Sequence, residues 1–318
     1  MSTFTFAHVS DLHLPFEPAL TPLQRLSKRQ LSAWSWQRRR ALHRTDILEA
    51  LADDLRMQAV DHVLITGDIT NFSLPGEFHQ AARWLAALGT PERLSLVPGN
   101  HDALVHVPHE EGLGLWADWT RSEDGWPFVH QRGDMALIGL NSALPTAPLL
   151  ARGRLGTQQL ERLEEVLVAE GMADRIRIVM LHHPPARGAI QWRKALADAP
   201  ALRAVLQRAG AELLLHGHAR DARLDSVPGP REPIPCLCVP SSSAVPNPKD
   251  EGALWHRLRL SRGPGGPSVE VEVRRWSTEV EAFVADGGYT LALPRNFGAA
   301  QTEQSERVKH DARPVLTQ

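Results

Sequence analysis

Five short polar blocks, each at the end of an apolar run, constrain the fold of this chain more than any other feature. Each run has the length and composition of a buried strand. Ligands of sheet-based α/β folds bind just beyond the carboxyl ends of the strands, so we expect the five blocks to converge on one site. The blocks are Asp11-Leu12-His13, Gly67-Asp68, Gly99-Asn100-His101-Asp102, His182-His183-Pro184 and His216-Gly217-His218.

Strand-like runs alternate with amphipathic helical stretches over most of the chain, which is typical of βαβ units and predicts an α/β fold. From about 222 to 276 the pattern changes to strands separated by Pro and Gly turns, and these strands are expected to complete a second sheet packed on the first. The predicted strands are 4–10, 61–66, 93–98, 134–140, 176–181 and 212–215, and the predicted helices are 45–58, 76–88, 157–170 and 199–209.

The domain boundaries follow from the same pattern. We predict a single domain over residues 1–277 with a basic, Trp-containing helical insertion at about 20–44. Residues 278–318 are assigned to a C-terminal extension, which is expected to be mobile from about 298 because little apolar matter remains there.

The composition is that of an ordinary soluble enzyme. The chain has 318 residues, of which 42% are hydrophobic and 23% charged, and its formal net charge is -2. This charge gives no global basic field, so general nucleic-acid binding is not expected. The N-terminus has no basic region followed by an apolar stretch, which favours the cytoplasm. Cys236 and Cys238 are interpreted as buried thiols.

The insertion has an unusual charge pattern. No acidic residue lies between Glu17 and Asp46, whereas seven Lys and Arg residues do, together with Trp34 and Trp36. A basic helix that carries Trp can lie on an anionic membrane surface or guide an anionic substrate. The alternative is a solvated helix whose Trp side chains pack on the domain.

The polar blocks carry the donor atoms that metal ions prefer. Asp11 and His13 alternate on an extended strand end, so both can face one cation. Asp68 could bridge two cations through its two carboxylate oxygens, and Asn100 offers a neutral carbonyl oxygen. His101 and Asp102 are spaced for an imidazole that a carboxylate orients.

In this order the blocks resemble the pattern of the calcineurin-like metallophosphoesterase superfamily: Asp-x-His, Gly-Asp, Gly-Asn-His-Asp/Glu, His and Gly-His-x-His. The resemblance covers residues 4 to about 220. It implies a two-sheet β-sandwich flanked by helices, a four-layer fold. It also implies a centre of two metal ions, commonly iron, manganese or zinc, which activate a hydroxide for attack on phosphorus.

The resemblance also implies a role for each matching residue. Asp11 and His13 belong to the first metal, and Asp68 bridges both. His101 would stabilise the transition state or protonate the leaving oxygen, with Asp102 orienting its ring. The second metal would be held by Asn100, His182 and His218. The residues themselves, not the resemblance, decide two further positions: His183 is expected to support the ligands from behind or to line the pocket and contact substrate, and His216 is not assigned as a ligand because a regular strand points it to the opposite face.

One position departs from the pattern. Arg220 stands where the family carries its last histidine ligand, and a guanidinium has no lone pair to donate to a cation. Three hypotheses follow. The first metal site is a ligand short and binds weakly, or Asp221 supplies the missing donor, or Arg220 turns into the pocket and binds the substrate phosphate.

The function that these observations favour is metal-dependent hydrolysis of a phosphoester, most of all a small-molecule phosphodiester similar to cyclic nucleotides or glycerophosphodiesters. One alternative is a lipid phosphate or pyrophosphate hydrolase that contacts a membrane peripherally through residues 20–44. Another is a non-catalytic binding protein on the same scaffold. The pocket walls are expected from residues 14–45, 103–127 and 184–198.

Overall fold

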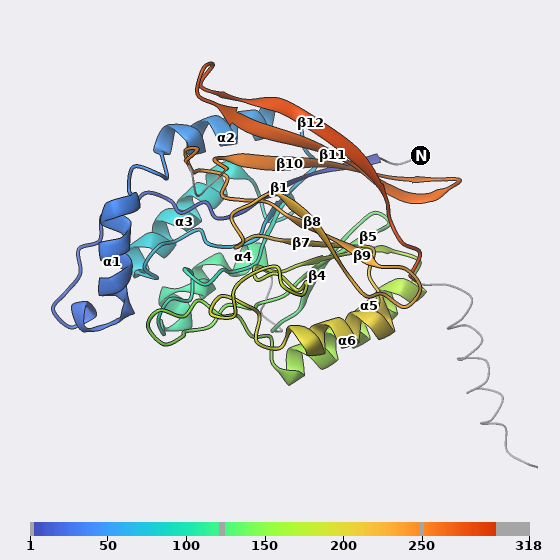
Figure 1. Ribbon diagram of the computed structural model, residues 1–318, viewed down its shortest axis with the longest axis horizontal. Coiled ribbons are helices and arrows are strands. Elements are labelled where there is room, and N and C mark those ends of the chain that lie inside the picture. Colours follow the sequence, from blue (N-terminus) through green and yellow to red (C-terminus); the bar gives the residue numbers. More distant parts are fainter. Residues whose placement is uncertain (1–2, 121–124, 248–250, 297–318) are drawn as a thin grey trace, which may run out of the picture.

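The computed structural model describes residues 3–120, 125–247 and 251–296 (Figure 1). Two six-stranded sheets face one another, and helices cover both outer faces. This arrangement of four layers confirms the predicted two-sheet sandwich flanked by helices.

The first sheet has the strand order β12-β11-β10-β1-β2-β3. Its parallel part, β1 to β3, comes from the βαβ units that the sequence predicts, whereas β10 to β12 are antiparallel. The strands are β1 (Thr3–Val9), β2 (His62–Ile65), β3 (Leu94–Leu96), β10 (Leu254–Gly263), β11 (Gly266–Ser277) and β12 (Ala282–Ala292).

The second sheet has the order β4-β5-β6-β7-β9-β8. Its central strands β5, β6, β7 and β9 are parallel, so their carboxyl ends lie at one edge. The strands are β4 (Phe128–Arg132), β5 (Met135–Gly139), β6 (Ile176–Met180), β7 (Leu213–His216), β8 (Arg223–Val227) and β9 (Ile234–Cys238).

Helices α2 and α3 pack on the first sheet, and α5 and α6 pack on the second. Among the residues that the structure describes, no helix has the length and hydrophobicity needed to cross a membrane. The helices are α1 (Lys28–Arg39), α2 (Thr45–Met57), α3 (Pro75–Leu88), α4 (Ala117–Thr120), α5 (Thr157–Met172) and α6 (Ala199–Ala209), with 3₁₀ turns η1 (Gln24–Leu26), η2 (His109–Glu111) and η3 (Leu113–Trp116).

The alternation of side chains along β1 places this strand between two cores. Phe6 points into the core between the sheets, whereas Ala7 and Val9 point toward α2 and α3. A strand that is buried on both faces reads as a continuous apolar run, which is why the sequence shows a run here rather than an alternating pattern.

The late strands differ from the prediction. They do not form the second sheet alone: β8 and β9 join the second sheet, while β10 and β11 pair with β1 in the first. The predicted domain ends at residue 277, but β12 pairs with β11 from Ser277↔Ala282 to Ser268↔Ala292. Part of the predicted C-terminal extension therefore belongs to the first sheet as its edge strand β12. The tail predicted from 298 lies outside the described residues.

A buried ion pair fixes α2 to the antiparallel part of the first sheet. The Asp54 carboxylate accepts hydrogen bonds from Arg274 Nε and Nη2, both at 2.7 Å, and from Trp255 Nε1 at 3.0 Å. Asp54 is 1% exposed and Arg274 8% exposed. Removal of Asp54 would leave the buried Arg274 guanidinium with only the partly exposed Glu272 carboxylate, at 2.9 Å, as an ion-pair partner, and would take the acceptor of Trp255 Nε1 away.

We therefore expect Asp54→Ala to lower the free energy of unfolding by about 3 kcal/mol, measured by urea denaturation. Asp53→Ala is the matched control, because Asp53 on the same helix makes only an exposed ion pair with Arg56; its cost should stay below about 1 kcal/mol. Equal losses in the two variants would contradict the assignment.

Candidate metal centre

The polar blocks from both sheets meet where their parallel strands end. β1, β2 and β3 lead into Asp11, Asp68 and Asn100, and β6 and β7 lead into His182 and His218. The parallel pairing continues past β1 and β2: Asp11 N donates to Gly67 O at 2.9 Å, and His13 N donates to Asp68 O at 3.0 Å. The backbone thus brings the first two blocks side by side before any side chain acts.

Two glycines allow the blocks to approach closely. Gly67 has φ +99°, and a Cβ there would lie 2.6 Å from Gly99 N and 2.8 Å from His182 Nδ1. A Cβ on Gly217 would lie 2.6 Å from Asp11 Oδ2. These contacts explain why the second and fifth blocks contain glycine beside the functional residue.

Several non-glycine residues at the centre have left-handed backbone conformations, with φ values between 43° and 68°. Such conformations cost free energy in residues with a Cβ and persist where surrounding contacts fix them, often at functional sites. The residues at the centre with this conformation are Asp11, His13, Asp68, His218 and Arg220.

Backbone carbonyls fix the tautomers of three histidines. A carbonyl oxygen only accepts, so the ring nitrogen that faces it carries the proton. His182 Nδ1 lies 2.7 Å from Thr66 O, His13 Nδ1 lies 3.3 Å from Thr70 O, and His218 Nε2 lies 3.1 Å from Lys194 O. The other nitrogen of each ring then presents its lone pair to the centre, as is usual for metal-binding histidine.

The side-chain atoms that converge on His182 are acceptors. His182 Nε2 lies 3.1 Å from His218 Nδ1, 3.3 Å from Asn100 Oδ1 and 3.4 Å from Asp68 Oδ2. Neutral rings would direct lone pairs at one another, so this position requires a positive charge. Although burial opposes protonation, attraction to Asp68 raises the pKa of His182 to about 9. This direction also indicates that the position favours a positive charge. A divalent cation bound by these four donors would meet it.

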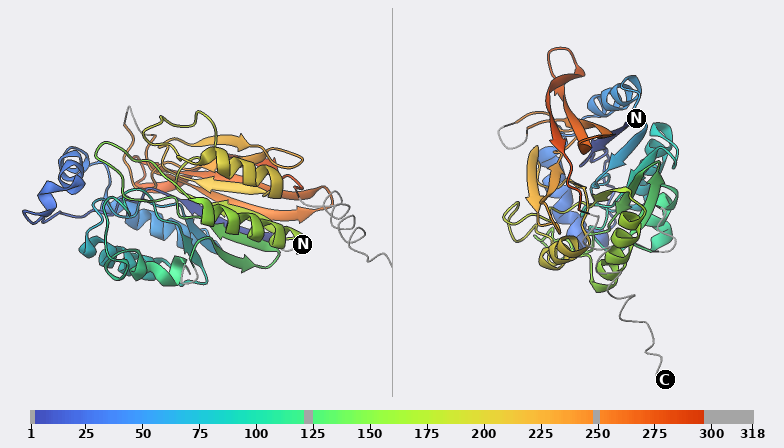
Figure 2. Two further views of the ribbon diagram at one scale, coloured as in Figure 1. Left: turned by 90° about the horizontal axis from the view of Figure 1, so that it is seen from below. Right: turned by 90° about the vertical axis from the view of Figure 1, so that its right-hand side faces the viewer.

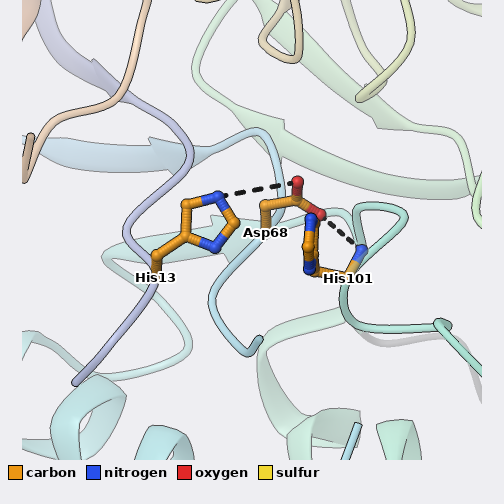
Figure 3. Close-up of side chains that lie close together, drawn as sticks. All are labelled: His13, Asp68 and His101. Carbon is orange, nitrogen blue, oxygen red and sulfur yellow. Dashed lines mark hydrogen bonds and ion pairs between the residues drawn. The ribbon is translucent and has the colours of Figure 1, made fainter. Parts of the chain in front are cut away.

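A second group of donors shares Asp68 with the first, and both groups approach its Oδ2 atom. His13 Nε2 is 3.9 Å from Asp68 Oδ2 (Figure 3). The same nitrogen is 4.0 Å from Asp11 Oδ1. Asp68 therefore belongs to both groups, and together with Asp11 and His13 it could hold a second cation. This position has three of the predicted donors, whereas the other has four.

The surroundings favour the ionised form of Asp68 but disfavour that of Asp11. Burial opposes ionisation of Asp68, but the positive fields of His182, His101 and His13 hold its pKa well below the ordinary value. Burial, followed by repulsion from Asp68, raises the pKa of Asp11 in spite of the nearby His182. Two buried carboxylates within one centre favour a cation between them.

Asp102 does not orient the ring of His101, contrary to the prediction. Its carboxylate accepts hydrogen bonds from four backbone N–H groups between 2.8 and 3.0 Å, those of Gly99, Asp68, Ile69 and Thr70. Burial, together with the charge of Asp68, raises the pKa of Asp102 to about 7. Asp102 thus joins the second block to the third.

The backbone positions His101 instead. His101 Nδ1 lies 3.0 Å from Asn71 O, and the His101 N–H donates to Asp68 Oδ1 at 2.7 Å (Figure 3). Asn71 O fixes the proton on Nδ1 and leaves Nε2 as the atom that would exchange a proton with a ligand. The sequence offered no signal for this role of Asn71.

His183 does not line the pocket. Its ring is fully buried, lies behind those of His182 and His218, and bonds through Nδ1 to Ser142 Oγ at 2.8 Å. A side chain without exposed surface cannot touch a substrate, so the substrate-contacting role expected for His183 is wrong, whereas the alternative position beside the ligands His182 and His218 agrees with the structure. His216 is also fully buried, and its Nδ1 lies 3.1 Å from Gly217 O.

Arg220 lies at the wall of the pocket that opens on the metal donors. This pocket, of about 310 Å³, is also lined by Lys194, which the sequence did not single out because it lies in a loop without a motif. Asp221 forms an ion pair with Arg223. Of the three hypotheses for the missing ligand, this geometry supports Arg220 in the pocket rather than Asp221 as a donor. The other lining residues are Asp11, Ser35, Asp68, Asn100, His101, Ala151 and His218.

Comparison with known proteins gives a match between residues 4–219 and the calcineurin-like phosphoesterase family. The chain is 25% identical over 224 residues to a probable cyclic nucleotide phosphodiesterase of Synechococcus, a match that covers 69% of this chain and 74% of that protein.

Two solved structures share the fold. A dimetal phosphatase from Danio rerio superposes with a TM-score of 0.59 at 15% identity, over 89% of this chain and 98% of that one. The purple acid phosphatase PPD1 from yellow lupin gives 0.54 at 13% identity, over 92% of this chain and 54% of that one.

The unequal donor sets predict unequal affinities for metal. We expect a chelator-treated sample to bind manganese or zinc in a tight step and a weaker step, each raising the melting temperature because binding favours the folded state. Elemental analysis and thermal unfolding measure the steps. His218→Ala should abolish the tight step, whereas His79→Ala, an exposed imidazole on α3, should change neither. Two steps of equal affinity would contradict the assignment.

Proposed function

Because the chain belongs to the calcineurin-like phosphoesterase family, a family of hydrolases that act on phosphoesters, we propose that its substrate is a phosphodiester. The observation that carries the proposal is the place of Asp68 in two groups of candidate metal ligands, beside His182 and His218 in one and beside His13 in the other. The relative described as a probable cyclic nucleotide phosphodiesterase supports a diester over a monoester.

The residue roles in this proposal follow the two donor groups. One ion would be held by Asp11, His13 and Asp68, and iron, manganese and zinc all suit these oxygen and nitrogen donors. Two such ions would polarise the phosphoryl oxygens and lower the pKa of the water that attacks phosphorus. The other ion would be held by Asp68, Asn100, His182 and His218.

The remaining work falls to side chains of the pocket. Asn71 O holds the His101 ring so that Nε2 can give a proton to the leaving oxygen, a step worth roughly 10² to 10⁴ in rate. Arg220 and Lys194 place two positive charges beside the donors. A guanidinium binds phosphate oxygens through paired N–H groups, so Arg220 would bind the phosphoryl group and offset the missing ligand of the first ion.

We expect the purified protein with added manganese to hydrolyse bis(p-nitrophenyl) phosphate, followed by nitrophenolate absorbance. Asn100→Ala should lower kcat/KM by at least about 100-fold because a ligand of the four-donor position is lost. Gln207→Ala removes an exposed carboxamide on α6 and should leave the rate unchanged. A failure to turn over with manganese, iron or zinc would favour a non-catalytic binding protein.

Arg220 has its own test. Arg220→Ala should raise KM and lower kcat/KM by about 10- to 100-fold, since a charged hydrogen bond to phosphate is lost. Arg220→Lys should restore part of the loss because it keeps the charge without the paired geometry. Arg208→Ala, on the outer face of α6, is the control. If Arg220→Ala behaved as Arg208→Ala does, the phosphate-binding role would be wrong.

A further inference from the structure

A second pocket, of about 340 Å³, adjoins the metal centre through Asn100 and His101. Three segments that are far apart in the sequence form its walls: α1, residues 149–151 and residues 191–194. The α1 wall repeats at helical spacing, so one face of this helix lines the pocket; its residues are Lys28, Leu31, Ser32 and Ser35.

Hydrogen bonds tie the three segments together. Lys28 Nζ donates to Thr146 Oγ1 at 2.6 Å and to Leu150 O at 2.7 Å. Ala151 N donates to Arg193 O at 3.0 Å. The mouth of the pocket is therefore one continuous rim rather than three independent loops.

Large apolar side chains on these segments, and on the turn that precedes α1, face solvent. Leu26 is 85% exposed, Leu149 80% and Trp192 67%. Trp34 is 57% exposed, whereas Trp36 on the same helix is buried against Phe72 and His43. α1 projects from one end of the molecule, so its outer face is open (Figure 2). We call the following set the rim surface: Leu23, Leu26, Leu31, Trp34, Leu149 and Trp192.

The three stretches of chain that carry the rim surface have charge of one sign. The sequence holds no Asp or Glu over 18–45, 135–160 or 175–197, the stretches that contain the three segments. Exposed cationic residues flank the apolar side chains instead: Arg25, Arg40, Arg187, Arg193 and Lys194.

We propose that the rim surface docks on an anionic membrane. Trp and Leu side chains enter the boundary between headgroups and acyl chains, while Lys and Arg beside them attract anionic lipid. Single Leu residues at a protein surface are ordinary, but an apolar patch on three stretches of chain that carry cations and no acidic residue matches the layered chemistry of such a membrane.

The docked orientation defines the substrate class. The pocket mouth would face the bilayer, and the pocket has apolar walls at Leu31, Leu104, Leu149 and Leu150 beside His101. An amphiphilic phosphoester could then place its phosphate at the metal centre while its apolar part follows these side chains. This step rests on the proposed phosphodiesterase function, whereas docking itself does not.

The test is co-sedimentation of the full chain with phosphatidylcholine vesicles that contain or lack phosphatidylserine. We expect binding to the anionic vesicles only, with a decrease at high salt. Leu26→Glu, Trp34→Glu and Trp192→Glu should each reduce the partition coefficient by about tenfold or more. Met57→Glu and Met172→Glu, at sites 71% and 70% exposed outside the rim, are matched controls and should bind as the wild type does.

The outcomes separate docking from catalysis. Absence of binding to anionic vesicles, or equal losses in rim and control variants, would overturn the docking proposal even if bis(p-nitrophenyl) phosphate is hydrolysed. Self-association that Trp34→Glu abolishes, without vesicle binding, would assign the rim surface to a second copy of the chain and also overturn it. Vesicle binding without any hydrolysis would support docking and count against the proposed function.

Discussion

The Asp68 carboxylate is the interaction on which the rest of the centre depends. It is buried where the two sheets meet, and ring nitrogens from both sheets face it: His13 follows β1, and His182 follows β6. The backbone then has to hold acceptors against one another, which explains the left-handed conformations there and the Asp102 carboxylate that gathers four N–H groups. This geometry lowers the stability of the fold, and the binding of positive charge would compensate for the cost.

The same constraint gives meaning to Arg220. A centre with two buried carboxylates carries excess negative charge, which a firmly held cation would offset, and a further histidine ligand would help to hold that cation. Here a guanidinium and the Lys194 ammonium stand at the pocket wall instead. Fixed positive charge that attracts phosphate would substitute in part for a tightly bound ion, although it cannot polarise water as a metal does.

The sequence predicts the centre well because each motif directly follows a buried strand, and strand ends of a parallel sheet lie together. Contacts that depend on backbone carbonyls could not be predicted: Asn71 O, Thr66 O and Lys194 O fix three rings, yet any residue can offer a carbonyl. β12 was missed for a related reason. It contains Gly287-Gly288 and is exposed along most of its length, so it lacks the apolar period that marks a strand.

The pocket walls show how local pattern and tertiary placement combine. Acid-free, Trp-bearing segments are visible in the sequence around Trp34 and Trp192, but their juxtaposition is not, because nearly 160 residues separate them. The Lys28 ammonium connects α1 to the loop at 146–150, because it donates hydrogen bonds to Thr146 Oγ1 and Leu150 O. Hydrogen bonds from Arg29 and Ser32 to the carbonyls of residues 71–73 hold the same helix beside the metal centre. Trp34 remains exposed, whereas Trp36, two residues on, turns inward to Phe72. One face of α1 thereby lines the pocket, and another carries the exposed Trp34 of the rim surface.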